Sequence, residues 1–163
     1  MKAKNLWIMC GPSGSGKSYF AKNNLMNGDN WCYISRDQIR YTTITKDDNY
    51  FSKEKLVYEL FAGCIIDALQ DQTYTDIIAD ATHLNWASRR KLLNAIHLLD
   101  GNYSHIHIIP VWINTSLAVA IERNNTRTGL EHVPDVEIEK MYKRRRHPRF
   151  DEFKYTAIMV VNE

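Results

Sequence analysis

Residues 11–18 read Gly-Pro-Ser-Gly-Ser-Gly-Lys-Ser, directly after the apolar run Leu6–Cys10. This stretch matches the pattern G-x-x-x-x-G-K-[ST] at every fixed position. Its glycines allow the backbone to curl so that successive N–H groups face one anion. A segment with helical spacing follows and aims its positive end at the same point. The sequence therefore predicts a phosphate-binding loop between a buried strand and a helix.

Two side chains of this loop carry chemistry. Lys17 is expected to reach the β- and γ-phosphate oxygens of ATP, and the Ser18 hydroxyl is expected to ligate Mg²⁺. Hydrolases, motors, switches and small kinases all use such a loop, so it does not identify the acceptor. The residues expected to bind the nucleotide here are Gly11, Ser13, Gly14, Ser15, Gly16, Lys17 and Ser18.

Outside the loop, strand-like and helix-like segments alternate. Strands are expected at Leu6–Cys10, Trp31–Ile34, Asp76–Asp80, Ile106–Ile113 and Ile158–Val161. Helices are expected at Lys17–Leu25, Lys53–Leu69, Trp86–Leu99, Ser116–Arg123 and Asp135–Arg146. This alternation predicts an α/β fold in which helices cover both faces of a parallel sheet of four or five strands.

Composition excludes several classes of protein. The 163 residues are 44% hydrophobic and 25% charged, a globular balance that fits one domain over residues 1–163. No apolar run approaches the ~20 residues of a membrane helix, so no membrane association is expected. The three cysteines show no CxxC spacing, which favours a reducing, cytoplasmic location.

Charged residues follow two of the expected strands. Asp37 and Arg40 come after the second strand and would share one side of a helix that starts there. Asp37 can then accept a hydroxyl proton, and Arg40 can hold a phosphate of the acceptor or the transferring group. The alternative is that Asp37 caps a helix and Arg40 is a surface charge. Asp80 ends the third strand, where a carboxylate orients Mg²⁺ or caps a helix. His83, in the loop after it, is expected to be a polar surface residue.

Arginines also mark the region from residue 123 onward. Arg123 and Arg127 flank the start of a segment, at about 124–134, that is expected to form a lid over ATP. Arginines of such a lid stabilise charge on the γ-phosphoryl group. The alternative is that they complement a helix C-terminus. The block 140–149 is basic and contains no acidic residue. It is either a solvated helix face or a docking surface for phosphates.

As a set, these residues resemble a known family. Gly11–Ser18, Ser35-Arg36-Asp37-x-x-Arg40, Asp80–Asn85 with Arg89-Arg90, and Arg123-x-x-x-Arg127 occur in this order. The pattern resembles the 5′-hydroxyl polynucleotide kinase domain of phage and bacterial end-healing enzymes, from Leu6 to about Arg146.

The resemblance implies a P-loop kinase-type three-layer sandwich with a helical lid. It implies that Lys17 and Ser18 bind ATP and Mg²⁺, that Asp37 is the general base and that Arg40 contacts the acceptor. Arg127 would belong to the lid, with Arg123 assisting. The acceptor would be the 5′-OH end of DNA or RNA. Two alternatives stay open: a kinase of a small molecule or nucleoside, and a nucleotide-binding, toxin-like or regulatory module that transfers nothing.

Overall fold

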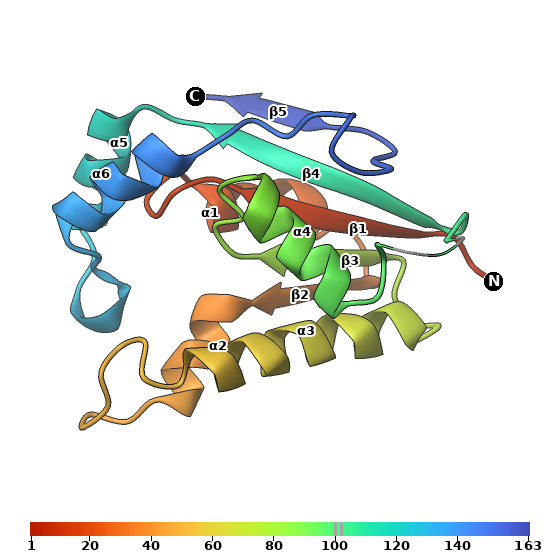
Figure 1. Cartoon of the computed structure of the whole chain (residues 1–163), viewed down its shortest axis with the longest axis horizontal. Coiled ribbons are helices and arrows are strands. Elements are labelled where there is room, and N and C mark those ends of the chain that lie inside the picture. The colour runs from red at the N-terminus through yellow and green to blue at the C-terminus, as the bar shows by residue number, and fades with distance from the viewer. Residues whose placement is uncertain (100, 102) are drawn as a thin grey trace.

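The computed structural model describes residues 1–99, 101 and 103–163. Within them, five parallel strands form one sheet with the spatial order β2-β3-β1-β4-β5 (Figure 1). The strands are β1 (Lys4–Cys10), β2 (Trp31–Ser35), β3 (Asp76–Asp80), β4 (Ile106–Asn114) and β5 (Met159–Asn162). Each lies where an apolar run predicts it. The expected parallel α/β fold is confirmed, with five strands.

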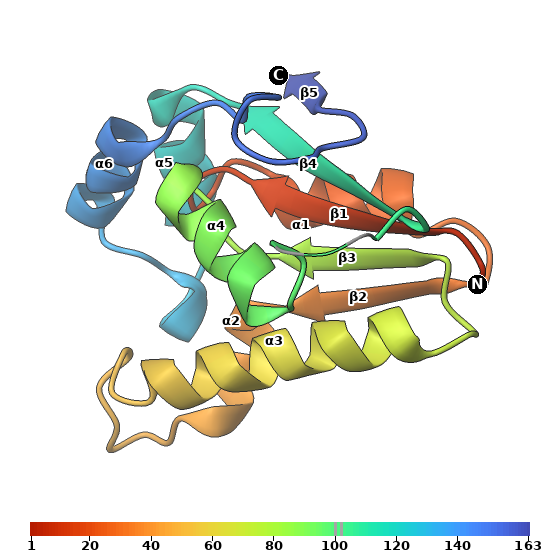
Figure 2. The same ribbon diagram turned by 45° about the vertical axis from the view of Figure 1, so that its right-hand side comes forward.

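Helices cover both faces of the sheet, and alternate residues of β1 show how. Leu6 and Ile8 belong to the larger core cluster, which includes side chains of α3 (Glu54–Gln70) and α4 (Trp86–Ala95). Met9 belongs to the smaller cluster on the other face, with Ala21 of the helical segment that follows the phosphate loop. Figure 2 shows these helices on opposite sides of the sheet. Burial on both faces explains why the central strands β3, β1 and β4 are largely apolar.

The sequence places some helix ends wrongly. The expected helix Trp86–Leu99 ends at Ala95, because the chain turns at His97, whose φ is 62°. The expected helix Lys17–Leu25 is divided into α1 (Lys17–Phe20) and a π-helical turn (Ala21–Leu25).

The last helix also ends early. α6 (Asp135–Arg144) stops before Arg146, because Arg145 is extended and its side chain is used elsewhere. The Arg145 guanidinium lies 4.2 Å from the Tyr142 ring centroid and 5.8 Å from that of Trp112. It also donates to the carbonyl oxygen of Thr115 at 3.3 Å. Arg145 is therefore a packing residue within the basic block.

The remaining elements lie beyond the carboxyl ends of the strands. They are α2 (Arg36–Thr43), α5 (Leu117–Asn125) and a 3₁₀ turn, η2 (Gly129–Glu131), besides α6. The segment 124–134, which the sequence predicts to be a lid, includes this turn. The Tyr41 hydroxyl of α2 donates to the carbonyl oxygen of Leu130 at 3.4 Å, so the segment contacts α2 across the edge of the sheet. No helix in the described part of the chain has the length and apolar character of a membrane span.

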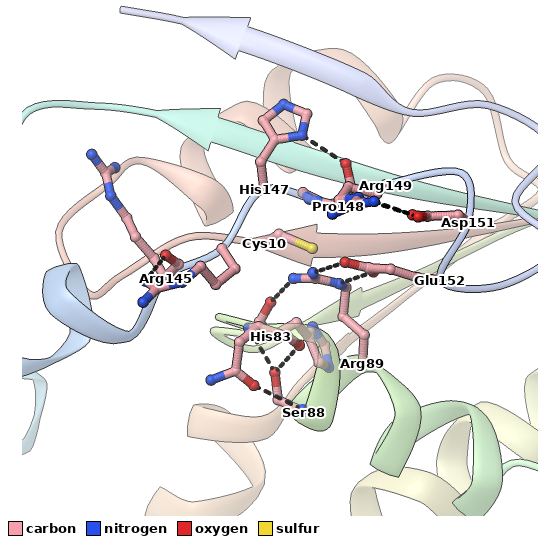
Figure 3. A network of polar contacts seen from close by, with 12 residues as sticks. Cys10, His83, Ser88, Arg89, Arg145, His147, Pro148, Arg149, Asp151 and Glu152 are labelled. Atoms are coloured by element: carbon pink, nitrogen blue, oxygen red, sulfur yellow. Dashed lines mark hydrogen bonds and ion pairs between the residues drawn. The ribbon is translucent and has the colours of Figure 1, made fainter.

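A buried ion pair fastens the C-terminal part of the chain to α4 (Figure 3). Arg89 is fully buried and donates to Glu152 through Nε at 2.9 Å and through Nη2 at 2.7 Å. Its Nη1 donates to the carbonyl oxygen of His83 at 3.1 Å, and the Tyr155 hydroxyl donates to Glu152 at 3.1 Å. Every charge in this network has a partner, which is the condition for a tolerable buried ion pair.

We expect Arg89→Met to lower the free energy of unfolding by about 3–5 kcal/mol, because it leaves the Glu152 carboxylate buried without its cation. Urea denaturation at constant pH measures this change. Arg149→Met is the matched control: its ion pair with Asp151 is 71% and 64% exposed, so its loss should cost less than about 1 kcal/mol. Equal losses in both variants would show that the Arg89 pair does not fasten the fold.

Candidate functional site

The phosphate loop has the backbone geometry that its glycines predict. Gly14 has φ of 79° and Gly16 has φ of 98°, values that favour glycine. A Cβ atom on Gly14 would lie 2.2 Å from the carbonyl oxygen of Ala120 in α5. This close approach means that the loop and α5 are packed backbone to backbone, so only glycine fits at position 14.

The loop presents unpaired donors. The backbone N–H groups of Gly14, Gly16, Lys17 and Ser18 donate to no backbone acceptor in the described residues. The buried hydroxyl of Ser15 is also without a partner there. Buried or clustered polar groups without partners are costly, and successive N–H groups that face one side form an anion site. The loop thus has free donors of the kind that bind phosphate oxygens.

Lys17 brings the candidate site together. Its side chain is buried, and its ammonium group donates to the carbonyl oxygen of Pro12 at 2.9 Å. Burial lowers the pKa of Lys17, whereas the nearby negative charges of Asp80 and Asp37 raise it and the positive charge of Arg127 lowers it further. Asp37, Asp80 and Arg127, which come from three other segments, therefore each lie within electrostatic range of Lys17.

Asp80 links the loop to β3. The Ser18 hydroxyl donates to the Asp80 carboxylate at 2.6 Å, and the Tyr33 hydroxyl of β2 donates to the same oxygen. Burial and the Asp80 charge both raise the pKa of Tyr33, so Tyr33 stays a proton donor. Asp80 is not a helix cap, because the cap of α4 is Asn85.

These residues fit a magnesium ion. Hydroxyl and carboxylate oxygens are the ligands that Mg²⁺ prefers, and Ser18 and Asp80 place one of each side by side beside the phosphate loop. Elsewhere in the described ranges, no group of three or more His, Cys, Asp or Glu side chains forms a metal cage. The pair of Ser18 and Asp80 suits Mg²⁺, because this ion is usually held by one or two protein groups together with substrate phosphates.

Asp37 and Arg40 form a supported pair on α2. The cap of α2 is Ser35, whose hydroxyl accepts from the backbone N–H of Gln38 at 3.3 Å, and Arg40 is only 4% exposed. The alternative in which Asp37 caps a helix and Arg40 is a surface charge is therefore wrong. Arg40 donates to Asp37, whose own side chain is 60% exposed. A carboxylate oriented by a buried arginine thus faces solvent at the carboxyl edge of the sheet.

Glu54, at the start of α3, is a residue of the candidate site that the sequence analysis missed. Its carboxylate accepts from Arg40 Nε at 3.2 Å and from Arg40 Nη2 at 2.9 Å, and it also pairs with Arg36. Tyr50 packs its ring 4.8 Å from the Arg40 guanidinium and accepts a weak hydrogen bond from it at 3.3 Å. All three nitrogen atoms of the Arg40 guanidinium thus donate to Asp37, Glu54 or Tyr50. None of these hydrogen bonds is made to Asp80.

The two arginines of the predicted lid lie in different settings. Arg123, on α5, donates to the carbonyl oxygen of Ser15 at 3.2 Å and pairs with Glu163. It therefore braces the phosphate loop from outside. Arg127 follows the end of α5, is half-buried, and makes no side-chain hydrogen bond or ion pair with any residue in the described ranges. Its charge acts on Lys17, so Arg127 lies on the side of the phosphate loop that carries this lysine.

His83 is buried, so the expectation of a surface residue is wrong. Its Nδ1 donates to the carbonyl oxygen of Met9 at 2.8 Å, and its ring lies 6.1 Å from that of Phe61. Burial lowers the pKa of His83 to about 3, which keeps the ring neutral at physiological pH. The backbone φ of 37° is unusual for a non-glycine residue. The histidine fastens the loop after β3 to β1.

A family comparison agrees with this geometry. The profile of a family described as AAA domain matches residues 6–148 of the chain. No curated protein gives a significant match.

Solved structures share the fold at low sequence identity. A chain of the Pnkp1/Rnl/Hen1 RNA repair complex is 23% identical with a TM-score of 0.65, over 88% of this chain and 44% of that chain. A fungal RNA kinase is 13% identical with a TM-score of 0.63, over 99% and 75%. A gluconokinase from Sinorhizobium meliloti 1021 is 18% identical with a TM-score of 0.54, over 99% and 84%. This chain thus spans less than half of the RNA repair polypeptide. Together, these structures show that the fold is that of P-loop kinases.

We expect Gly14→Ala to destabilise the protein and to abolish nucleotide binding, because the added methyl group meets the Ala120 carbonyl oxygen and the residue must keep a positive φ. Thermal melting and ATP titration measure the two effects. Gly63→Ala is the control: it lies inside α3 with no atom near the new methyl group, so it should stabilise by about 0.5–1 kcal/mol. Normal ATP binding by Gly14→Ala would remove the loop from the site.

Proposed function

Since the chain belongs to the AAA domain family, we propose that it is an ATP-dependent kinase that transfers the γ-phosphoryl group of ATP to the 5′-OH end of a polynucleotide. The observation that carries this proposal is the position of Asp37, an oriented and exposed carboxylate within electrostatic range of Lys17. Hydrolases with this loop need an oriented water, whereas an oriented carboxylate suits removal of a proton from an alcohol acceptor. The similarity to an RNA kinase and to an RNA repair complex supports the nucleic-acid acceptor.

The proposed transfer follows from the roles of three side chains and the loop backbone. The 5′ oxygen of the acceptor attacks the γ-phosphorus while the bond to the β,γ-bridging oxygen breaks, and ADP leaves. Asp37 accepts the proton of the hydroxyl. Lys17 and Arg127 stabilise the negative charge of the transferring group, with the backbone N–H groups of the loop.

Ser18 and Asp80 are the residues that would hold Mg²⁺ beside the β- and γ-phosphates. The ion supplies charge neutralisation at the phosphate oxygens. Tyr33 keeps the Asp80 carboxylate in the required orientation through its hydrogen bond.

Arg40 is proposed here as a positioning residue. Its guanidinium is occupied by Asp37, Glu54 and Tyr50, so direct contact with an acceptor phosphate would require it to break one of these bonds. Held in place, it fixes the Asp37 carboxylate at the edge of the site. Glu54 in turn balances Arg36 and Arg40.

An acceptor screen tests the proposal. With ATP labelled at the γ-phosphate, we expect label on single-stranded 5′-OH oligonucleotides and none on the same oligonucleotides that already carry a 5′-phosphate. Nucleosides, gluconate and other sugars run in parallel. Lys17→Ala, purified in the same way, is the control for a contaminating kinase and should transfer no label.

Two results would contradict the proposal. Label on sugars or nucleosides alone would identify the protein as a small-molecule kinase. The gluconokinase with the same fold is the reason that gluconate is included in the screen. Binding of ATP without transfer to any acceptor would make it a nucleotide-binding module.

A further inference from the structure

An exposed aromatic residue stands at the start of α4. Trp86 is 47% exposed although it is a large apolar side chain. The ring of Phe153 lies nearly parallel to it, at 11° and 6.3 Å between centroids, and the Arg90 guanidinium lies 5.4 Å from the Trp86 centroid. Phe153 and Arg90 therefore both pack against the exposed ring of Trp86.

A second aromatic–cation stack connects this surface with the candidate site. The Lys91 ammonium lies 4.1 Å from the centroid of the Tyr58 ring, and the Arg36 guanidinium lies 5.0 Å from the same ring. Arg36 directly precedes Asp37 on α2. The path from Asp37 to Phe153 therefore runs over Arg36, Tyr58 and Lys91. It continues through Arg90, which is next to Lys91 on α4 and lines the same hollow, to Trp86.

At its Trp86 end, the surface along this path is hollowed and basic. One hollow of about 310 Å³ is lined by Trp86, Arg90 and Lys91, among others, and a second of about 430 Å³ is lined by Arg90, Phe153 and Lys154. The two share Arg90 and Leu99. Among the described lining residues the only carboxylate is Glu152, which is paired with Arg89. The charge that faces solvent there is positive.

The loop before α4 lies against the phosphate loop. The backbone N–H of Gly11 donates to the carbonyl oxygen of Thr82 at 2.9 Å. The backbone N–H of Arg146 donates to the carbonyl oxygen of Leu84 at 2.7 Å, which brings the exposed side of the basic block to the same loop. The loop that leads into Trp86 therefore adjoins both the phosphate loop and the basic block.

We propose that this path binds the single-stranded part of the acceptor that follows the phosphorylated end. The inference rests on the proposed function. Bases stack on aromatic rings and on guanidinium planes whatever their sequence, and lysine and arginine neutralise the phosphates between them. Trp86 and Arg90 form its centre. If the path is used, a sugar or nucleoside acceptor, which has no following nucleotides, gains nothing from it.

Kinetics with acceptors of two lengths test the path. For a 5′-OH ten-nucleotide single strand, we expect Trp86→Ala and Arg90→Gln each to raise KM about tenfold, which is the worth of one stacked base. For a 5′-OH dinucleotide, and for ATP, KM should not change, and kcat should stay at the wild-type value. Arg90→Gln should also reduce the slope of log KM against log salt by about 0.7.

Matched variants test whether a change in KM comes from loss of the Trp86 ring or from loss of a surface charge in general. Trp86→Phe keeps a ring and should restore most of the affinity. Lys55→Gln removes a cation that is 91% exposed on α3 and should leave KM unchanged for both acceptors. An unchanged KM for the ten-nucleotide strand in Trp86→Ala, or an equal rise for the dinucleotide, would overturn the proposal.

Direct binding distinguishes this failure from failure of the proposed function. Fluorescence anisotropy of a labelled ten-nucleotide strand reports binding without any transfer. Tight binding that Trp86→Ala weakens would support the path even if no acceptor is phosphorylated. Absence of binding by the wild-type protein would overturn it.

Discussion

The hydrogen bond from Ser18 to the Asp80 carboxylate joins the phosphate loop after β1 to the end of β3. This bond can form because β1 and β3 are parallel neighbours, so both strands end at the same edge of the sheet. β2 adds Tyr33 to the same carboxylate and, at its end, leads into the helix that carries Asp37. The order β2-β3-β1 therefore gathers three polar segments at one place, and the rest of the site is arranged around them.

A second constraint comes from the burial of Arg40. A guanidinium that is almost fully buried must be paired, because an uncompensated buried charge is costly. Asp37 and Glu54 provide the compensation from two helices, and Tyr50 covers the guanidinium. The consequence for chemistry is that Asp37 is the exposed end of a fully paired cluster. Its carboxylate can meet a hydroxyl without a large loss of side-chain entropy.

The sequence predicts the parts of this site that depend on local patterns. The loop 11–18, the strand-end position of Asp80 and the shared side of Asp37 and Arg40 all follow from short spacings. The partners that come from distant segments carry no such pattern. Glu54 pairs with a residue 14 positions away, and Arg89 with one 63 positions away. Such pairs are decided by tertiary packing, which also buries His83 and draws Arg145 out of the predicted helix.

A double-mutant cycle on Asp37 and Arg40 tests the central claim, that one carboxylate held by a buried arginine accepts the proton. Single-turnover transfer is measured for Asp37→Asn, Arg40→Gln and the double variant, with melting temperature and ATP affinity as controls for folding. The account predicts that Asp37→Asn lowers the transfer rate by about 10²–10⁴-fold. The rate of the double variant should lie within about threefold of the rate of Asp37→Asn alone, because Arg40 acts through Asp37. Losses that multiply in the double variant would contradict it, since Arg40 would then act on the acceptor or the transferring group by itself.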